Sequence, residues 1–158
     1  MKTKSFRTLS VLAVAIATIS SGANTAELEE VIVTAQKRAE SLQDVPVSLM
    51  AISGTKIAEA GLHSFQELSQ YVPNLSITEN AVNTIISMRG IGVGANQSFE
   101  QSVGVYVDGV HYGKSRQSRT ALYDVQQVEV LRGPQGILFG KNTLAGAINV
   151  TTATPDAD

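Results

Sequence analysis

Short apolar or alternating runs, separated by residues that favour turns, begin at residue 45 and continue to residue 152. Runs of roughly four to eight residues that are rich in Val, Ile and Thr and bounded by Gly, Pro, Asn or Ser are typical of β-strands. The pattern predicts strands at residues 47–53, 75–78, 84–89, 103–107, 125–131 and 147–152.

Two short helices are predicted between the first two strands. Residues 55–60 are followed by Gly61, which can take the left-handed conformation that closes a helix. Ser64 and Glu67 have the spacing of a capping box, and Pro73 is expected to end the second helix. The predicted fold is a small α+β domain, with a mixed β-sheet and short helices packed on it.

The N-terminus has the pattern of a secretory signal peptide. Basic residues up to Arg7 precede an apolar run at residues 9–19, and small or polar residues follow up to Ala26. The run is too short for a transmembrane helix, which needs about 20 residues, although a buried N-terminal helix is the alternative. We expect cleavage after Ala23 or Ala26, which divides the chain into a signal peptide (1–26), a polar segment (27–40) and a domain (41–158).

Charge and composition exclude several classes of function. The chain of 158 residues has 12 Lys and Arg against 14 Asp and Glu and no cysteine. Without residues 1–26 it keeps 9 basic and 14 acidic residues, a net charge of −5, so nucleic-acid binding is not expected. Disulfides and thiolate chemistry are excluded, and two isolated histidines, His63 and His111, do not predict a metal site.

Two glycine-rich stretches resemble nucleotide-binding motifs only superficially. Residues 90–95, GIGVGA, follow a predicted strand but lead into a polar segment, not into the helix that a dinucleotide site needs. Residues 136–141, GILFGK, have the wrong glycine spacing for a phosphate loop. No nucleophile and base are arranged for catalysis, so we predict neither an enzyme nor a cofactor.

An apolar patch interrupts the polar residues 27–44. The patch lies within residues 29–35, EEVIVTA, and its four consecutive β-branched residues, 31–34, favour an extended backbone. Such a segment in a mobile polar tail can add as a strand to the sheet edge of another protein. It can equally be an edge strand that folds back on its own domain, and these residues alone do not decide between the two.

A set of motifs in the second half of the chain carries more information. In chain order they are SMRG at 87–90, YVDGV at 106–110, VEVLRGPQG at 128–136, Leu138, Gly140 and GAINVT at 146–151. This ordered set closely resembles the plug domain of TonB-dependent outer-membrane receptors, and EVIVTA at 30–35 looks like the TonB box of that family. The resemblance covers the signal peptide, the box and residues 41–152.

The resemblance implies a plug that closes the pore of its own β-barrel until a substrate binds from outside. The outer membrane has no ATP, so energy would come from the partner protein TonB, which pairs with the box by strand addition. The expected TonB contacts are Glu30, Val31, Ile32, Val33, Thr34 and Ala35. Ferric siderophores are the commonest cargo of the family, although cobalamin, haem and carbohydrates also occur. An iron chelate needs no metal ligand from the protein.

The resemblance also suggests roles for other residues. Arg89 and Arg132, each followed by glycine, are expected to pair with carboxylates on the barrel wall and so retain the plug; Glu129 is an alternative local partner for either. The polar connections 92–101 and 111–118 are expected to face the substrate. The candidate contacts there are Asn96, Gln97, Phe99, Tyr112 and Arg116.

Length separates this chain from complete receptors of the family. Their barrels have about 22 strands, and this chain ends at Asp158. We therefore expect the N-terminal part of a receptor in the outer membrane of a Gram-negative cell. A small eight-stranded barrel is not favoured, because the predicted strands are short and aromatic residues are few. The alternative function is a free-standing periplasmic module that binds or regulates without transport.

Overall fold

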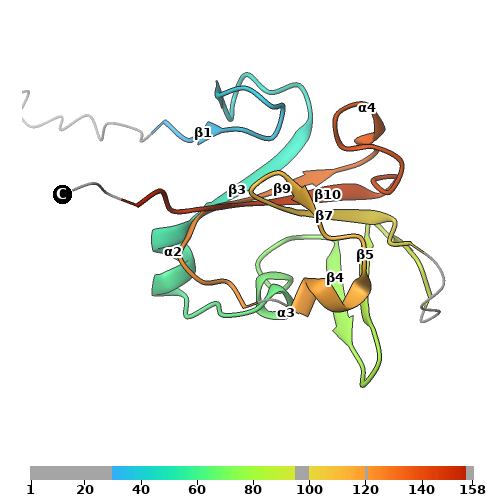
Figure 1. The fold of residues 1–158 in the computed structure, drawn as a ribbon. Helices are drawn as coiled ribbons and strands as arrows, with labels where there is room; N and C mark the ends of the chain where they lie inside the picture. Colours follow the sequence, from blue (N-terminus) through green and yellow to red (C-terminus); the bar gives the residue numbers. More distant parts are fainter. Residues whose placement is uncertain (1–29, 95–99, 120, 156–158) are drawn as a thin grey trace, which may run out of the picture.

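A five-stranded mixed sheet lies at the centre of the molecule (Figure 1). The computed structural model describes residues 30–94, 100–119 and 121–155. The spatial order of the sheet is β3 (Ser48–Ser53), β9 (Val125–Arg132), β10 (Gly146–Thr152), β7 (Val103–Val107) and β8 (Val110–His111). β10 pairs in parallel with β7 and antiparallel with β9, whereas β3 and β8 pair antiparallel at the two edges. The predicted α+β fold with a mixed sheet is confirmed.

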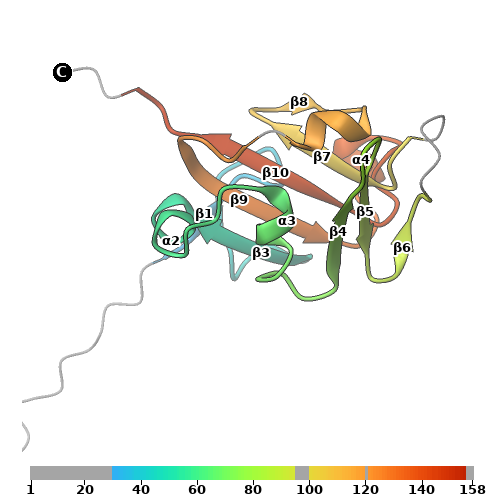
Figure 2. The ribbon, with the colours of Figure 1, turned by 90° about the horizontal axis from the view of Figure 1, so that it is seen from below.

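Both faces of this sheet are covered, by different elements (Figures 1 and 2). On one face lie α2 (Gly54–Glu59), α3 (Phe65–Leu68), the short helix η2 (Ser115–Arg119) and a second sheet. That sheet is antiparallel, in the order β4 (Leu75–Glu79), β5 (Thr84–Met88) and β6 (Ile91–Gly92). On the opposite face lie β1 (Ile32–Val33), its partner β2 (Glu40–Ser41) and α4 (Gly136–Phe139). We call this second side the β1 face.

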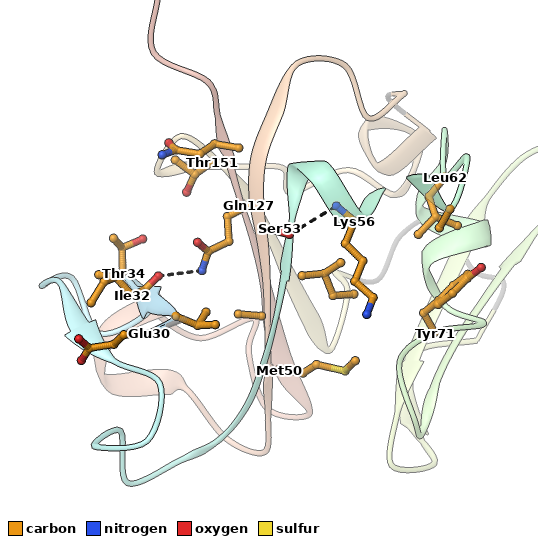
Figure 3. A pocket seen from close by; sticks show the side chains of 15 residues that line it. Glu30, Ile32, Thr34, Met50, Ser53, Lys56, Leu62, Tyr71, Gln127 and Thr151 are labelled. Atoms are coloured by element: carbon orange, nitrogen blue, oxygen red, sulfur yellow. Dashed lines mark hydrogen bonds between the residues drawn. The ribbon is translucent and has the colours of Figure 1, made fainter. Parts of the chain in front are cut away.

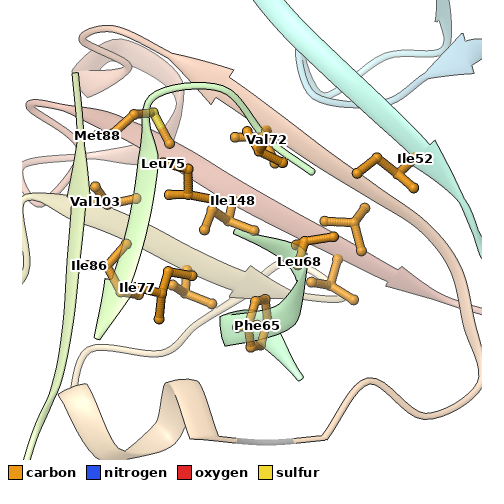
Figure 4. Packing of buried hydrophobic residues seen from close by; sticks show 14 of the residues in the cluster. Ile52, Phe65, Leu68, Val72, Leu75, Ile77, Ile86, Met88, Val103 and Ile148 are labelled. Carbon is orange, nitrogen blue, oxygen red and sulfur yellow. The ribbon is translucent and has the colours of Figure 1, made fainter. Parts of the chain in front are cut away.

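The main core fills the space between the central sheet and the helices (Figure 4). Side chains alternate between the two faces of a strand, so Ile148 and Val150 of β10 enter this core, whereas Ala147 belongs to a smaller cluster on the β1 face. Phe65 and Leu68 of α3 are buried against the sheet. The smaller cluster consists of Ala35, Tyr106, Leu131, Phe139 and Ala147.

The predicted helix signals are present at both short helices. Gly61 has a φ of +64° just after α2, and Ser64 and Glu67 form the capping box of α3. The Glu67 carboxylate accepts from the backbone N–H of His63 at 2.6 Å and of Ser64 at 3.2 Å. These hydrogen bonds, chiefly the one from His63, lower the pKa of the Glu67 carboxyl. α3 itself ends at Leu68, before the predicted boundary at Pro73.

Two tight turns explain where the predicted strands end. Asp108 and Gly109 have φ values of +49° and +80°, as a two-residue hairpin turn requires, and they join β7 to β8. Arg89 and Gly90 also have positive φ, +53° and +78°, between β5 and β6. The strand predicted at 84–89 therefore ends at Met88, because Arg89 takes the left-handed conformation of the turn.

Candidate functional site

The TonB-box-like segment lies against the central sheet on the β1 face. β1 pairs antiparallel with β2, with Val33 opposite Glu40, and Val31 O accepts a hydrogen bond from Leu42 N at 2.9 Å. Val33 and Ala35 are buried, with 1% and 0% of their surface exposed, whereas Ile32 is 47% exposed. Of the two arrangements left open by the sequence, the structure shows the segment folded back on its own domain. The expectation of a mobile tail is wrong for residues 31–35.

A buried carboxylate beneath the segment holds it in place. Glu129 of β9 is fully buried, and its Oε1 accepts from the backbone N–H of Thr34. Asn149 Nδ2 donates to Oε2 at 2.8 Å, and Gln127 Nε2 lies 3.3 Å from Oε1. Burying a carboxylate is unfavourable unless hydrogen bonds replace its water, and here neutral donors from three residues do so. Among the described residues, no lysine or arginine forms an ion pair with Glu129.

A groove of about 530 Å³ runs alongside the same segment (Figure 3). Ile32 and Thr34 lie on one side of it, and Met50, Lys56 and Tyr71 lie on the other. The dashed line in Figure 3 between Gln127 and Ile32 marks a hydrogen bond of 3.1 Å from Gln127 Nε2 to Ile32 O. The exposed side of β1 therefore borders an open, mainly apolar groove.

The two candidate latch arginines come together at another end of the domain. A Cβ atom added to Gly133 would lie 3.4 Å from Arg89 Nη1, so the Arg89 guanidinium reaches the residue next to Arg132. Arg132 is half-buried, and its Nε is buried without a hydrogen-bond partner in the part of the chain that the structure describes. The Arg89 guanidinium therefore lies beside the turn that follows Arg132, and neither arginine forms an ion pair among residues 30–94, 100–119 and 121–155.

Glu129 is not the local partner of either arginine, so that alternative is wrong. The side chains of Glu129 and Arg132 are three residues apart on β9, and an odd spacing places them on opposite faces of the sheet. Glu129 faces β1, and its oxygens are bonded to Thr34, Gln127 and Asn149.

Two large apolar residues that follow β9 in the chain are exposed. These residues flank or belong to α4, which is held to the sheet by a hydrogen bond from the buried hydroxyl of Tyr106 to the backbone oxygen of Phe139. Burial raises the pKa of the Tyr106 hydroxyl. The neighbouring Ile137 is fully exposed, and Leu144 is 65% exposed.

The candidate substrate contacts are only partly described. Asn96, Gln97 and Phe99 lie outside the described residues. Tyr112 packs against the main core and is half-buried, whereas Arg116 is exposed on η2. The structure therefore separates these two, because only Arg116 has a freely exposed side chain.

Residues 30–94, 100–119 and 121–155 contain neither a metal-binding cluster nor a membrane-spanning helix. Within the described part of the chain, no cluster of His, Asp or Glu side chains has the grouping of a metal site. No helix in this part of the chain combines the length and apolar character needed to cross a lipid bilayer.

Comparison with known proteins identifies the family. A family model described as the TonB-dependent receptor plug domain matches residues 41–147. The chain belongs to this plug family. The matched residues include every strand from β3 to β9, all the helices described above and the first two residues of β10.

Two curated relatives are similar over most of this chain. The plug domain is 38% identical to the pesticin receptor of Yersinia pestis over 141 residues, which is 85% of this chain and 20% of that protein. It is 40% identical over 129 residues to the pesticin receptor of Yersinia enterocolitica, covering 79% of this chain and 19% of the relative. The chain therefore spans about a fifth of the length of these relatives. Both are named as receptors, not as enzymes.

Solved structures give the same family. The ferric yersiniabactin uptake receptor from Yersinia pestis matches with a TM-score of 0.62 and 40% identity, over 71% of this chain and 18% of that one. The ferripyoverdine receptor of Pseudomonas aeruginosa matches with a TM-score of 0.64 at 16% identity, over 80% of this chain and 17% of that one. The second likeness shows the fold alone.

The role of Glu129 beneath β1 was missed by the sequence reasoning. A signal was present, because this acidic residue lies between valines in a strand that was predicted to be apolar. A buried acid needs hydrogen-bond donors, and Asn149, on the strand predicted at 147–152, carries such a donor. Its partner Thr34, 95 residues away in the chain, could not be found in this way.

Proposed function

We propose that this plug domain is the gate of an outer-membrane receptor that takes up a ferric siderophore with energy from TonB. The match of residues 41–147 to the plug family carries this proposal. The 40% identity to a ferric yersiniabactin uptake receptor supports an iron chelate as the class of substrate. The remainder of such a receptor would be the barrel that surrounds the plug.

Residues 30–35 are the proposed TonB contact. Ile32 is exposed beside an open groove, and β1 is only two residues long, so few backbone hydrogen bonds hold it to β2. A short, weakly paired strand can leave its neighbour and add to the sheet of a partner. Residues 1–26 are the proposed signal peptide, which exports the receptor from the cytoplasm and is then cleaved.

Arg89 and Arg132 are the proposed latch to the barrel. The unpartnered, buried Nε of Arg132 supports this role, because a buried donor without an acceptor is costly. A carboxylate on the barrel wall would supply the acceptor. The exposed Ile137 and Leu144 would pack against the same wall.

The polar connections at residues 92–101 and 111–118 are the proposed substrate-facing side. Arg116 is exposed and can bind an acidic chelate, and Asn96, Gln97 and Phe99 remain candidates. Tyr112 would contribute mainly by positioning its loop, because its side chain packs against the core.

Proline substitution in β1 tests the proposed TonB contact in the complete receptor. Ile32→Pro or Val33→Pro removes a backbone N–H and constrains the preceding residue. We expect siderophore uptake to be abolished and siderophore binding to cells to stay nearly unchanged. The control is Ile32→Val, which keeps the backbone and should keep uptake. Uptake at the parental rate in both proline variants would refute the assignment of the box.

A further inference from the structure

β1 has one edge paired with β2 and a second edge that faces the central sheet. On the β2 side, Val31 O accepts from Leu42 N, and Val33 is paired with Glu40. Backbone groups of successive residues point to opposite edges of a strand. The groups of Ile32 and Thr34 therefore point to the second edge, which is the edge that an incoming strand would have to use.

Two side chains of β9 occupy the hydrogen-bonding groups of that second edge. Gln127 Nε2 donates to Ile32 O at 3.1 Å, and Thr34 N donates to Glu129 Oε1. Gln127 and Glu129 are two residues apart on a strand, so they share a face. Ile32 and Thr34 have the same spacing. One side chain supplies a donor and the other an acceptor, as a neighbouring strand would.

Burial makes this arrangement favour the closed position. Glu129 is fully buried. When Thr34 moves away from the sheet, the Glu129 carboxylate loses one hydrogen-bond donor, and only water can replace that donor. Asn149 and Gln127 stay with Glu129 in either position, because they belong to the central sheet. The carboxylate is thus held ready for Thr34 to return.

We infer that Gln127 and Glu129 form a clamp that covers the second edge of β1 and must release it before a partner strand can pair there. The inference rests on the proposed role of residues 30–35 as the TonB contact. The matching partner is an extended backbone whose own N–H and C=O groups replace the two side chains. Gln127 and Glu129 would then set the fraction of time for which β1 is available.

Thiol labelling of a buried reporter measures that fraction directly. The chain has no cysteine, so Ala35→Cys, at a fully buried position next to β1, reacts only when the segment leaves the sheet. In this background Gln127→Ala should raise the labelling rate roughly 2- to 10-fold, as expected for the loss of one hydrogen bond. Glu129→Ala should raise it by more than about 10-fold. The matched control is Gln126→Ala, an exposed glutamine one residue away.

A second reporter separates release of β1 from general loosening of the fold. Ala145→Cys lies in the main core, where Ala145 is 2% exposed, and its labelling rate should not change with Gln127→Ala. Equal rates at Ala35→Cys for the Gln127 and Gln126 variants would overturn the clamp. Equal gains at both reporters for Gln127→Ala would also overturn it. Gln127→Ala keeps the test valid if Glu129→Ala fails to fold.

Binding of the purified periplasmic domain of TonB tests the consequence. Apparent affinity scales with the fraction of the chain in the competent state, so Gln127→Ala should bind TonB more tightly by the same factor as its gain in labelling. If labelling rises but no variant binds TonB, the clamp stands and the proposed partner is wrong. If all variants bind TonB equally although labelling differs, release of the clamp is not required and the inference fails.

Discussion

Replacing Gly146 by alanine is expected to destabilise the plug domain, because no space exists for a methyl group at that position. Gly146 is the first residue of β10 and pairs with Arg132 on one side and with Val103 on the other. An added Cβ would lie 2.3 Å from Leu131 O and 2.4 Å from Met88 Sδ. The Leu131 oxygen belongs to the backbone of the central sheet, so it cannot move away without distorting β9.

The size of the effect follows from two opposing terms. Overpacking a well-packed site costs about 1–3 kcal/mol, whereas replacing glycine by alanine stabilises by about 0.4–1 kcal/mol through the unfolded chain. We expect a net loss of about 1–2 kcal/mol. With a urea m-value of about 2 kcal/mol/M, the unfolding midpoint should fall by roughly 0.5–1 M.

Urea unfolding of the chain without residues 1–26, followed by tyrosine fluorescence because the chain has no tryptophan, measures this shift. The control is Gly136→Ala, at the start of α4, where an added Cβ meets no heavy atom within 4 Å and φ is not positive. It should leave the midpoint unchanged or raise it slightly. If the two alanine variants unfolded at the same urea concentration, the close approach of β10, β9 and β5 around Gly146 would be wrong.

Three further predictions concern the latch, the helix cap and the fold. In a complete receptor, Arg89→Ala and Arg132→Ala should each make the pore leak ions or admit large antibiotics. The melting temperature of the isolated plug should stay about the same in both variants. If both changes instead unfolded the isolated plug and left the pore tight, the arginines would be internal structural residues. Because the Glu67 pKa is lowered in the folded chain, its stabilisation is present above the unfolded pKa and is lost as the pH falls through the folded pKa. Acid unfolding of Glu67→Gln should therefore lack this part of the pH dependence, and identical acid curves would contradict the role of the cap. Circular dichroism of residues 27–158 should show mixed α and β structure, and a mainly helical spectrum would refute the fold.

Elements with strong local signals were predictable from the sequence. The strands at 103–107 and 147–152 are apolar runs between turn residues, and they match β7 and β10 within one residue. The cap of α3 was equally clear, because the Ser64 and Glu67 side chains bond the backbone within the same turn. Local patterns of this kind do not depend on the rest of the chain.

Pairings between distant segments were not predictable in the same way. The sequence does not predict the parallel pairing of β10 with β7. Both strands are mainly apolar, so either could pair with several other strands. The position of β1 depends on hydrogen bonds with Gln127 and Glu129, each 95 residues from its partner in the chain. At the candidate site, the sequence indicated the segment at 30–35 and both arginines, but it did not show what covers the segment.

The order of strands in the central sheet has a consequence for how the chain folds. β3 is the first long strand to be made, yet its sheet neighbour is β9, and β9 and β7 are joined only through β10. A chain that emerges from its N-terminus therefore has no complete central sheet until residues 146–152 are available. High contact order of this kind slows folding and leaves apolar strands exposed in the meantime. A chain truncated before β10 should consequently stay unfolded, and a growing chain needs protection from aggregation until β10 is available.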